Sequence, residues 1–186
     1  MANAKLRIAG GSARGLPLTE PRGVRLRPTS GLVREAIFNI LDDTVVDAAV
    51  LDLYAGTGAL GIEALSRGAA SAVFIDAEAS SCRAILQSLS RAGFADRATV
   101  LRGRLPGALR TAEGRFDFIF MDPPYHEETA AETLLLLSSR LTPGGVVVYE
   151  HGSRYNPPER PTGLVLTEHR VYGDSAIALY ALQEGE

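Results

Sequence analysis

The chain has 186 residues, a hydrophobic composition of 46% and a formal net charge of −3, and Cys82 is its only cysteine. These values fit one globular domain and argue against a disulfide-stapled fold or a membrane protein, since no apolar run reaches the ~18 residues of a membrane span. No Cys/His spacing resembles a metal site and the first residues lack an apolar signal region, so we expect a cytoplasmic protein that binds no metal.

The N-terminal segment is strongly basic. Residues 1–34 hold seven Lys and Arg against Glu20 alone, a charge of 7 minus 1 or +6, so the other 152 residues carry −3 minus +6, or −9. Arginine pairs well with phosphate, which favours a nucleic-acid partner over a merely solvated surface. The candidate contact residues are Arg7, Arg14, Arg22, Arg25, Arg27 and Arg34.

Residues 1–43 are expected to form a basic hairpin and a helix that pack on the main domain, residues 44–186. Short extended pieces at 6–8 and 16–18 flank a glycine-rich turn, which predicts the hairpin. A helix follows from its N-cap at Ser30. Its apolar face is predicted to hold Leu32, Val33, Ala36, Ile37, Ile40 and Leu41, and its polar face Arg34, Glu35, Asn39 and Asp42.

Strand and helix patterns then alternate along the chain. The alternation predicts a parallel sheet with crossover helices, an α/β fold. Strands are expected at 49–54, 71–75, 98–102, 116–121 and 145–150, and helices at 59–67, 78–92 and 127–140. A proline-rich break at 157–161 precedes two β-rich runs, 164–172 and 176–182, which predict a terminal hairpin.

A glycine motif follows the first of these strands. Gly56, Gly58 and Gly61 form G-x-G-x-x-G at the start of a helix, and Asp76 lies 20 residues after Gly56. Such glycines let a ligand approach the backbone, and the acidic residue can accept ribose hydroxyls. Asp52 would repel a pyrophosphate but suits a cationic amino group, which favours S-adenosylmethionine over a dinucleotide. A strand-end cap is the alternative role for Asp52.

A second motif, Asp122-Pro123-Pro124-Tyr125, follows the apolar strand at 116–121. Prolines lack a backbone donor and leave their carbonyls free to accept, and the tyrosine ring can stack on a flat base. The motif therefore indicates a site for a planar amine, with a plain turn as the alternative. In an open parallel sheet, ligands bind beyond the carboxyl ends of the strands, so both motifs are expected to meet at one edge.

These motifs together resemble the RsmD family of bacterial RNA methyltransferases. The similarity runs through Arg7-Ile8-Ala9-Gly10-Gly11, the VREAIFNIL stretch at 33–41, residues 52–69, Asp122 to Tyr125 and Tyr172-Gly173. It implies a class I, Rossmann-like methyltransferase fold with a mainly parallel seven-stranded sheet and an antiparallel C-terminal hairpin. Gly31-Leu32 stands where the family usually carries Asp-Arg, and Gly103-Arg104 stands where a polar residue usually lies near the adenine, which implies a backbone contact there.

The resemblance implies methyl transfer to the exocyclic N2 of a guanine in 16S rRNA, the guanine-966 type, with S-adenosylmethionine as cofactor. We expect a monomer that acts on naked RNA or on a partly assembled 30S particle. A DNA (adenine-N6) methyltransferase, a dehydrogenase and a non-catalytic RNA-binding module are the alternatives. The expected catalytic residues are Asp122, Pro123, Pro124 and Tyr125, and the expected cofactor-binding residues are Asp52, Tyr54, Gly56, Thr57, Gly58, Gly61, Asp76 and Gly103.

Overall fold

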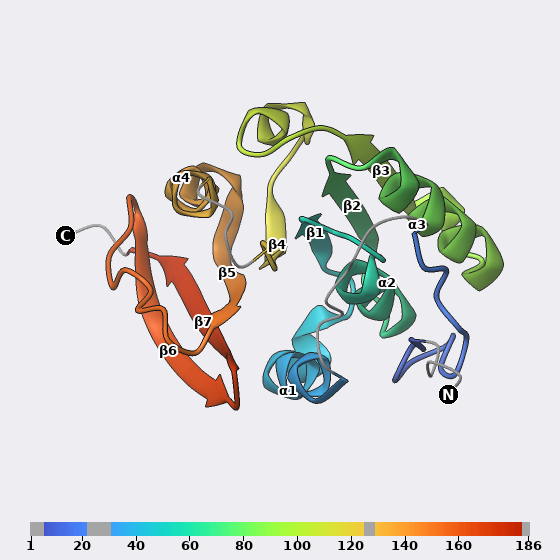
Figure 1. The fold of residues 1–186 in the computed structure, drawn as a ribbon, viewed down its shortest axis with the longest axis horizontal. Coiled ribbons are helices and arrows are strands. Elements are labelled where there is room, and N and C mark those ends of the chain that lie inside the picture. The colour runs from blue at the N-terminus through green and yellow to red at the C-terminus, as the bar shows by residue number, and fades with distance from the viewer. Residues whose placement is uncertain (1–5, 22–30, 125–128, 184–186) are drawn as a thin grey trace.

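A twisted sheet runs through the molecule, with helices on both of its faces (Figure 1). The computed structural model describes residues 6–21, 31–124 and 129–183. The strands are β1 (Ala49–Leu53), β2 (Ser71–Asp76), β3 (Ala98–Arg102), β4 (Phe116–Met121), β5 (Leu141–Gly152), β6 (Leu164–Tyr172) and β7 (Ser175–Leu182). Their order is β3-β2-β1-β4-β5-β7-β6, and only the pairings of β7 are antiparallel. The predicted sheet is therefore confirmed.

The helices are α1 (Gly31–Leu41), α2 (Ala59–Ser66), α3 (Ala79–Ala92) and α4 (Ala130–Leu135), with short 3-10 helices η1 (Asp42–Val45), η2 (Ala95–Arg97), η3 (Gly107–Thr111) and η4 (Leu137–Arg140). The single helix predicted over 127–140 is wrong in its described part, where α4 ends early and η4 follows. The strand predicted at 145–150 is longer than expected. It begins at Leu141, which pairs with Phe116, and ends at Gly152, which pairs with Ser175.

Alternate strand residues divide the core into two clusters. Val50, Phe74 and Phe120 belong to the cluster that α1, α2 and α3 complete. Leu53 and Met121 belong to the cluster that α4 and η3 complete on the other face. This two-sided burial explains why the central strands read as continuous apolar runs. In the described part of the chain, no helix is long and apolar enough to cross a membrane.

The polar and apolar faces predicted for α1 are wrong at two positions. Leu32 is 65% exposed and Arg34 is only 5% exposed. Arg34 turns inward because its guanidinium lies 3.7 Å from the buried carboxylate of Glu63 and donates to the carbonyl of Arg7 at 2.7 Å. The carboxylate and the carbonyl offset only part of the lost hydration, since Nε and Nη1 of Arg34 have no hydrogen-bond partner among the described residues.

The predicted N-terminal hairpin is present and is anchored to α2. Ile8 and Leu18 are buried in the same cluster as the sheet. The two oxygens of Glu63 accept the backbone N–H groups of Ala9 and Gly10, both at 2.7 Å. The hairpin, α1 and the sheet therefore share one core, with the hairpin lying next to α2 (Figure 1).

Candidate functional site

The candidate site lies where the chain changes direction across the sheet. From β1 the chain goes to β2 and β3 on one side and later to β4 and β5 on the other. Leu53 at the end of β1 is in parallel register with Ile75 of β2 and Met121 of β4. The segments after these strands therefore meet at one edge, as predicted. Such a switch point is where open α/β sheets bind their ligands.

Asp52 is buried at this edge, with 2% of its surface exposed. Its Oδ2 accepts the backbone N–H of Gly61 at 2.9 Å, which fixes the first turn of α2 against β1. Burial raises the pKa of Asp52 well above its ordinary value, and the charges of Asp122 and Asp76 raise it further. Asp52 thus caps α2 and also contributes to a group of carboxylates that a cation would stabilise.

The glycine motif forms a tight turn between β1 and α2. Gly56 and Gly58 have φ values of 56° and 73°, in the left-handed region that glycine adopts most easily. A Cβ at Gly61 would lie 2.3 Å from a ring carbon of Phe74, so α2 can approach the sheet this closely only without a side chain there. Thr57 is buried within the turn. This shape suits close approach of a ligand to the backbone.

Tyr54 precedes the glycine turn and is itself in the left-handed region, with φ of 56°. Its hydroxyl shares a 3.0 Å hydrogen bond with Oγ1 of Thr133 on α4. Non-glycine residues adopt this conformation rarely, and such strain is often found at functional sites. Tyr54, one of the expected cofactor-binding residues, therefore links the glycine turn to α4.

Asp76 holds the glycine turn from the end of β2. Its Oδ2 accepts the N–H of Gly56 at 2.7 Å and its Oδ1 accepts the N–H of Glu78 at 2.8 Å. Burial raises its pKa, and these two hydrogen bonds oppose that effect. Each carboxylate oxygen can accept two hydrogen bonds, so the group retains capacity for ribose hydroxyls.

Gly103 lies beside Asp76 at the end of β3. Its N–H donates to the Asp76 carbonyl at 2.9 Å. A Cβ at this position would lie 2.6 Å from the Cβ of Ala108, so the glycine permits η3 to pack here. Gly103, which is expected to contact the adenine through its backbone, thus lies at the same edge as Asp76, the expected ribose acceptor.

The second motif begins directly after β4. Asp122 and Pro123 are half-buried, and Pro124 is exposed. Asp52 pairs with Phe120, two residues before Asp122, and the two carboxylates are near enough for the charge of Asp122 to raise the pKa of Asp52. Tyr125 lies outside the described residues.

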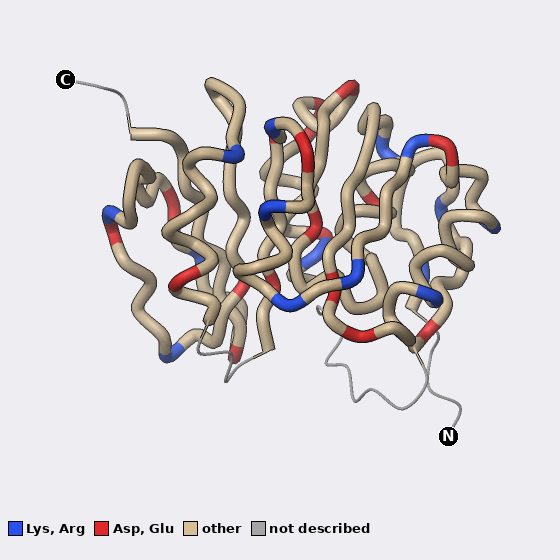
Figure 2. The backbone as a smooth tube through the Cα atoms, turned by 90° about the horizontal axis from the view of Figure 1, so that it is seen from above, with Lys and Arg blue, Asp and Glu red and all other residues tan. Residues whose placement is uncertain are grey.

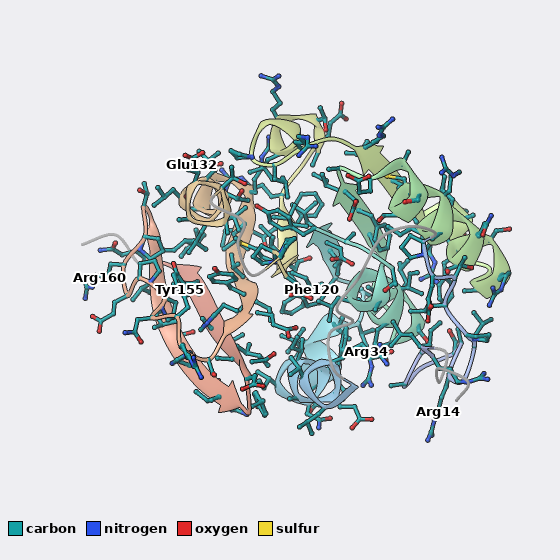
Figure 3. The ribbon with its side chains drawn as sticks, viewed as in Figure 1. Arg14, Arg34, Phe120, Glu132, Tyr155 and Arg160 are labelled. Carbon is teal, nitrogen blue, oxygen red and sulfur yellow. The ribbon has the colours of Figure 1, made fainter. Side chains whose placement is uncertain are left out.

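The predicted RNA-binding arginines have different environments. Arg7 and Arg14 are exposed on the hairpin, and Figure 3 shows Arg14 pointing away from the body and Arg34 between α1 and the hairpin. The prediction that Arg34 binds RNA is wrong, because its guanidinium is buried against Glu63. Arg22, Arg25 and Arg27 lie outside the described residues. Basic and acidic residues are interspersed across the described chain (Figure 2).

The hairpin lies at some distance from the glycine turn. The backbone N–H of Ser12 donates to the carbonyl of Ser66, the last residue of α2. At about 1.5 Å per residue, α2 separates this contact from the glycine turn by roughly 12 Å. An RNA that touches both regions must therefore span at least that length.

Sequence reasoning missed two features. Glu63 joins the hairpin, α1 and α2. In the sequence, it stands out as a charged residue within the otherwise apolar helix segment at 59–66. An aromatic cluster of Tyr149, His151, Tyr155 and His169 lies at the end of β5. Its only sequence signal was two rings at alternate positions, 149 and 151, since the other members come from segments that fold back onto β5.

A family model described as "Conserved hypothetical protein 95" matches residues 6–181. The "Ribosomal RNA small subunit methyltransferase D" of Escherichia coli is 34% identical over 180 residues, covering 96% of this chain and 90% of that protein. The "Putative rRNA methyltransferase YlbH" of Bacillus subtilis is 35% identical over 180 residues, covering 94% and 98%. A solved structure titled "Putative methyltransferase yhhF from Escherichia coli" is 34% identical, covers 97% of this chain and 99% of that chain, and has a TM-score of 0.85. The predicted class I methyltransferase fold is confirmed.

Proposed function

This chain belongs to the RsmD family of ribosomal RNA methyltransferases, and from that premise we propose that it methylates the exocyclic N2 of a guanine in 16S rRNA, with S-adenosylmethionine as methyl donor. One observation carries the proposal. Asp52, beside the glycine turn, and Asp122, directly after the adjacent strand β4, lie at the same edge of the sheet and interact electrostatically. A donor site and an acceptor site there would be neighbours.

The described residues fit the proposed cofactor. The carboxylates of Asp52 and Asp76 offer acceptors for an ammonium group and for ribose hydroxyls, and the glycines at 56 and 58 carry no side chain that would keep a ligand from the backbone. The backbone at Gly103 would lie beside the adenine, and Tyr54 and Thr57 would complete the site. The cofactor would supply an electrophilic methyl group. Holding it in one orientation is the task of these residues.

Asp122 and Pro123 would orient the acceptor amine. The N2 lone pair of guanine is delocalised into the ring, so alignment is a large part of catalysis and can contribute roughly 7 to 11 kcal/mol in favourable cases. We expect the Asp122 carboxylate to accept one N2–H and the Pro123 carbonyl to accept the other. As the nitrogen becomes cationic, its proton passes to Asp122. Pro124 would rigidify this segment, and Tyr125 would stack on the base.

The target nucleotide would have to leave its stack. A paired guanine inside a duplex cannot present N2 to a half-buried carboxylate, which favours a loop nucleotide or an extruded base. Arg7, Arg14, Arg22, Arg25 and Arg27 would bind flanking phosphates. The substrate would be naked 16S rRNA or a partly assembled 30S particle.

Transfer of a tritiated methyl group tests this function. We expect label in 16S rRNA but not in duplex DNA, and N2-methylguanosine after digestion. Mapping the modified nucleotide in rRNA from a deletion strain would identify the target, which we expect to be guanine 966. Label in DNA adenine would favour a DNA (adenine-N6) methyltransferase. Binding of RNA without methyl transfer would favour a non-catalytic RNA-binding module.

A further inference from the structure

Four rings from three segments pack together where β5 ends. The rings of His151 and His169 are stacked, with centroids 5.2 Å apart and an interplanar angle of 16°. Tyr155 packs edge-on against His151 at 5.4 Å and against Tyr149 at 6.2 Å. Neither the cofactor site nor the acceptor site described above uses this cluster. Figure 3 shows Tyr155 beside β5, β6 and β7.

The middle strand makes this arrangement possible. Ala178 of β7 pairs with Tyr149 on one side and with His169 on the other, and Ala176 pairs with His151. Both alanines are fully buried. Because they are small, the rings from β5 and β6 can meet above β7 without obstruction. The stacking of the two histidines thus depends on alanine at these positions.

The cluster is held rigidly and is open on one side. The hydroxyl of Tyr180 donates to the carbonyl of Pro158 at 3.0 Å, and the N–H of Tyr155 donates to the carbonyl of Gly152 at 2.9 Å, which fixes the segment carrying Tyr155. His151 covers the inner face of His169, yet His169 is exposed. His169 therefore keeps exposed surface while His151 stacks on one face of its ring.

His151 has a feature that packing alone does not explain. Its side chain is buried, with 6% exposed, and its Nδ1 contacts the carbonyl of Gly152 at 2.9 Å. Within the described residues, its Nε2 has no hydrogen-bond partner. An unsatisfied buried nitrogen costs free energy, so an aliphatic residue would fill this space at lower cost. The imidazole of His151 stacks on the His169 ring, which an aliphatic side chain could not do.

The cluster lies on the α4 face of the sheet, near the segment that carries Asp122. Tyr149 shares this face with Met121, the residue immediately before Asp122, and is in register with it one strand away, at about 4.8 Å. From these observations we propose that His169 and Tyr155 form a stacking platform for an unpaired base of the substrate RNA that flanks the target nucleotide. Proteins that bind single-stranded RNA commonly stack bases on His and Tyr rings. The exposed Arg154, next to Tyr155, supplies a positive charge for the backbone of the same nucleotide.

This inference rests on the proposed function, and RNA binding tests it separately from methyl transfer. Stem-loop RNAs carrying the target guanine are made with an abasic site at each unpaired flanking position in turn, and binding is measured by fluorescence anisotropy. We expect His169→Ala to weaken binding of the intact RNA by about 5- to 100-fold, as loss of one base stack implies. His169→Phe retains a ring and should bind nearly as wild type. Leu86→Ala, at an exposed position on α3, is the control for surface truncation.

The abasic series gives the decisive result. One abasic position should weaken wild-type binding as much as His169→Ala does, and the two changes combined should cause no further loss, because they remove the same contact. Additive losses, or full binding by His169→Ala, would overturn the proposal. The proposal would also be overturned if His169→Ala bound naked RNA normally but methylated ribosomal particles poorly, because that result would indicate a protein partner. If RNA binds as expected but receives no methyl group, the proposed activity fails while the platform stands.

Discussion

Asp122 directly follows β4, the strand that pairs with the Asp52 strand β1, and the charge of Asp122 raises the pKa of Asp52. Two carboxylates that interact in this way are unfavourable in the free protein and become favourable when a cationic group lies between or beside them. The donor proposed here is cationic, and the acceptor nitrogen becomes cationic during transfer. Asp52 therefore accounts for affinity toward the donor, and Asp122 accounts for stabilisation of the reacting amine.

The raised pKa of Asp52 makes stability depend on pH. Because burial disfavours its ionised form, the folded protein holds this proton at pH values where the unfolded chain, with a pKa of about 3.9, has released it. Stability should fall as pH rises through this window and level off once Asp52 is ionised in both states. Asp52→Asn removes this contribution and can still accept from Gly61. Urea unfolding across pH should therefore show that the stability of the variant increases relative to that of wild type as pH rises. Parallel curves of stability against pH would contradict the raised pKa of Asp52.

Gly61→Ala should damage both packing and cofactor binding. The added Cβ would lie 2.3 Å from a ring carbon of Phe74 and 3.1 Å from Oδ2 of Asp52. Overpacking of this kind typically costs about 1–3 kcal/mol, more than alanine gains in helix propensity. Thermal unfolding and calorimetry with S-adenosylmethionine measure the two effects. Gly107→Ala, where a Cβ would meet no atom within 4 Å, is the matched control, and equal behaviour of the two variants would refute the packing argument.

Glu63→Gln should loosen the N-terminal hairpin. Both oxygens of Glu63 accept backbone N–H groups, from Ala9 and Gly10, and an amide nitrogen cannot replace either oxygen as an acceptor. The change also leaves the Arg34 charge buried without its carboxylate, and breaking a buried pair costs about 3–5 kcal/mol. Urea unfolding measures the loss in the free energy of unfolding. Glu35→Gln, at an exposed position on α1, should stay within about 0.5 kcal/mol of wild type; a similar small effect at Glu63 would refute its anchoring role.

The hairpin arginines should appear in the salt dependence of RNA binding. With Arg34 buried, about five candidate phosphate contacts remain, which predicts a slope near −3.5 for log K against log salt on single-stranded RNA. Arg14→Gln should reduce this slope by about 0.7. Filter binding across salt concentrations measures it, with Arg115→Gln at the amino end of β4 as the control. An unchanged slope in Arg14→Gln would remove the hairpin from the RNA interface.

The sheet and the central site were predictable because their signals are local. Gly56, Asp76 and Asp122 each follow an apolar strand, and parallel topology then brings the strand ends to one edge. The position of Arg34 was not predictable in this way, since its partner Glu63 lies 29 residues further along the chain and the helical pattern alone places it on the polar face. The pairing of His151 with His169 likewise depends on the antiparallel strand β7 between them.

The most direct test of the central claim is the Asp122→Ala variant, assayed for both cofactor binding and methyl transfer. If Asp122 orients the amine and takes its proton, methyl transfer to RNA should fall by at least about 100-fold, while calorimetry shows S-adenosylmethionine binding nearly as in wild type. Retained turnover in Asp122→Ala would contradict the account, because the acceptor site would then lie elsewhere.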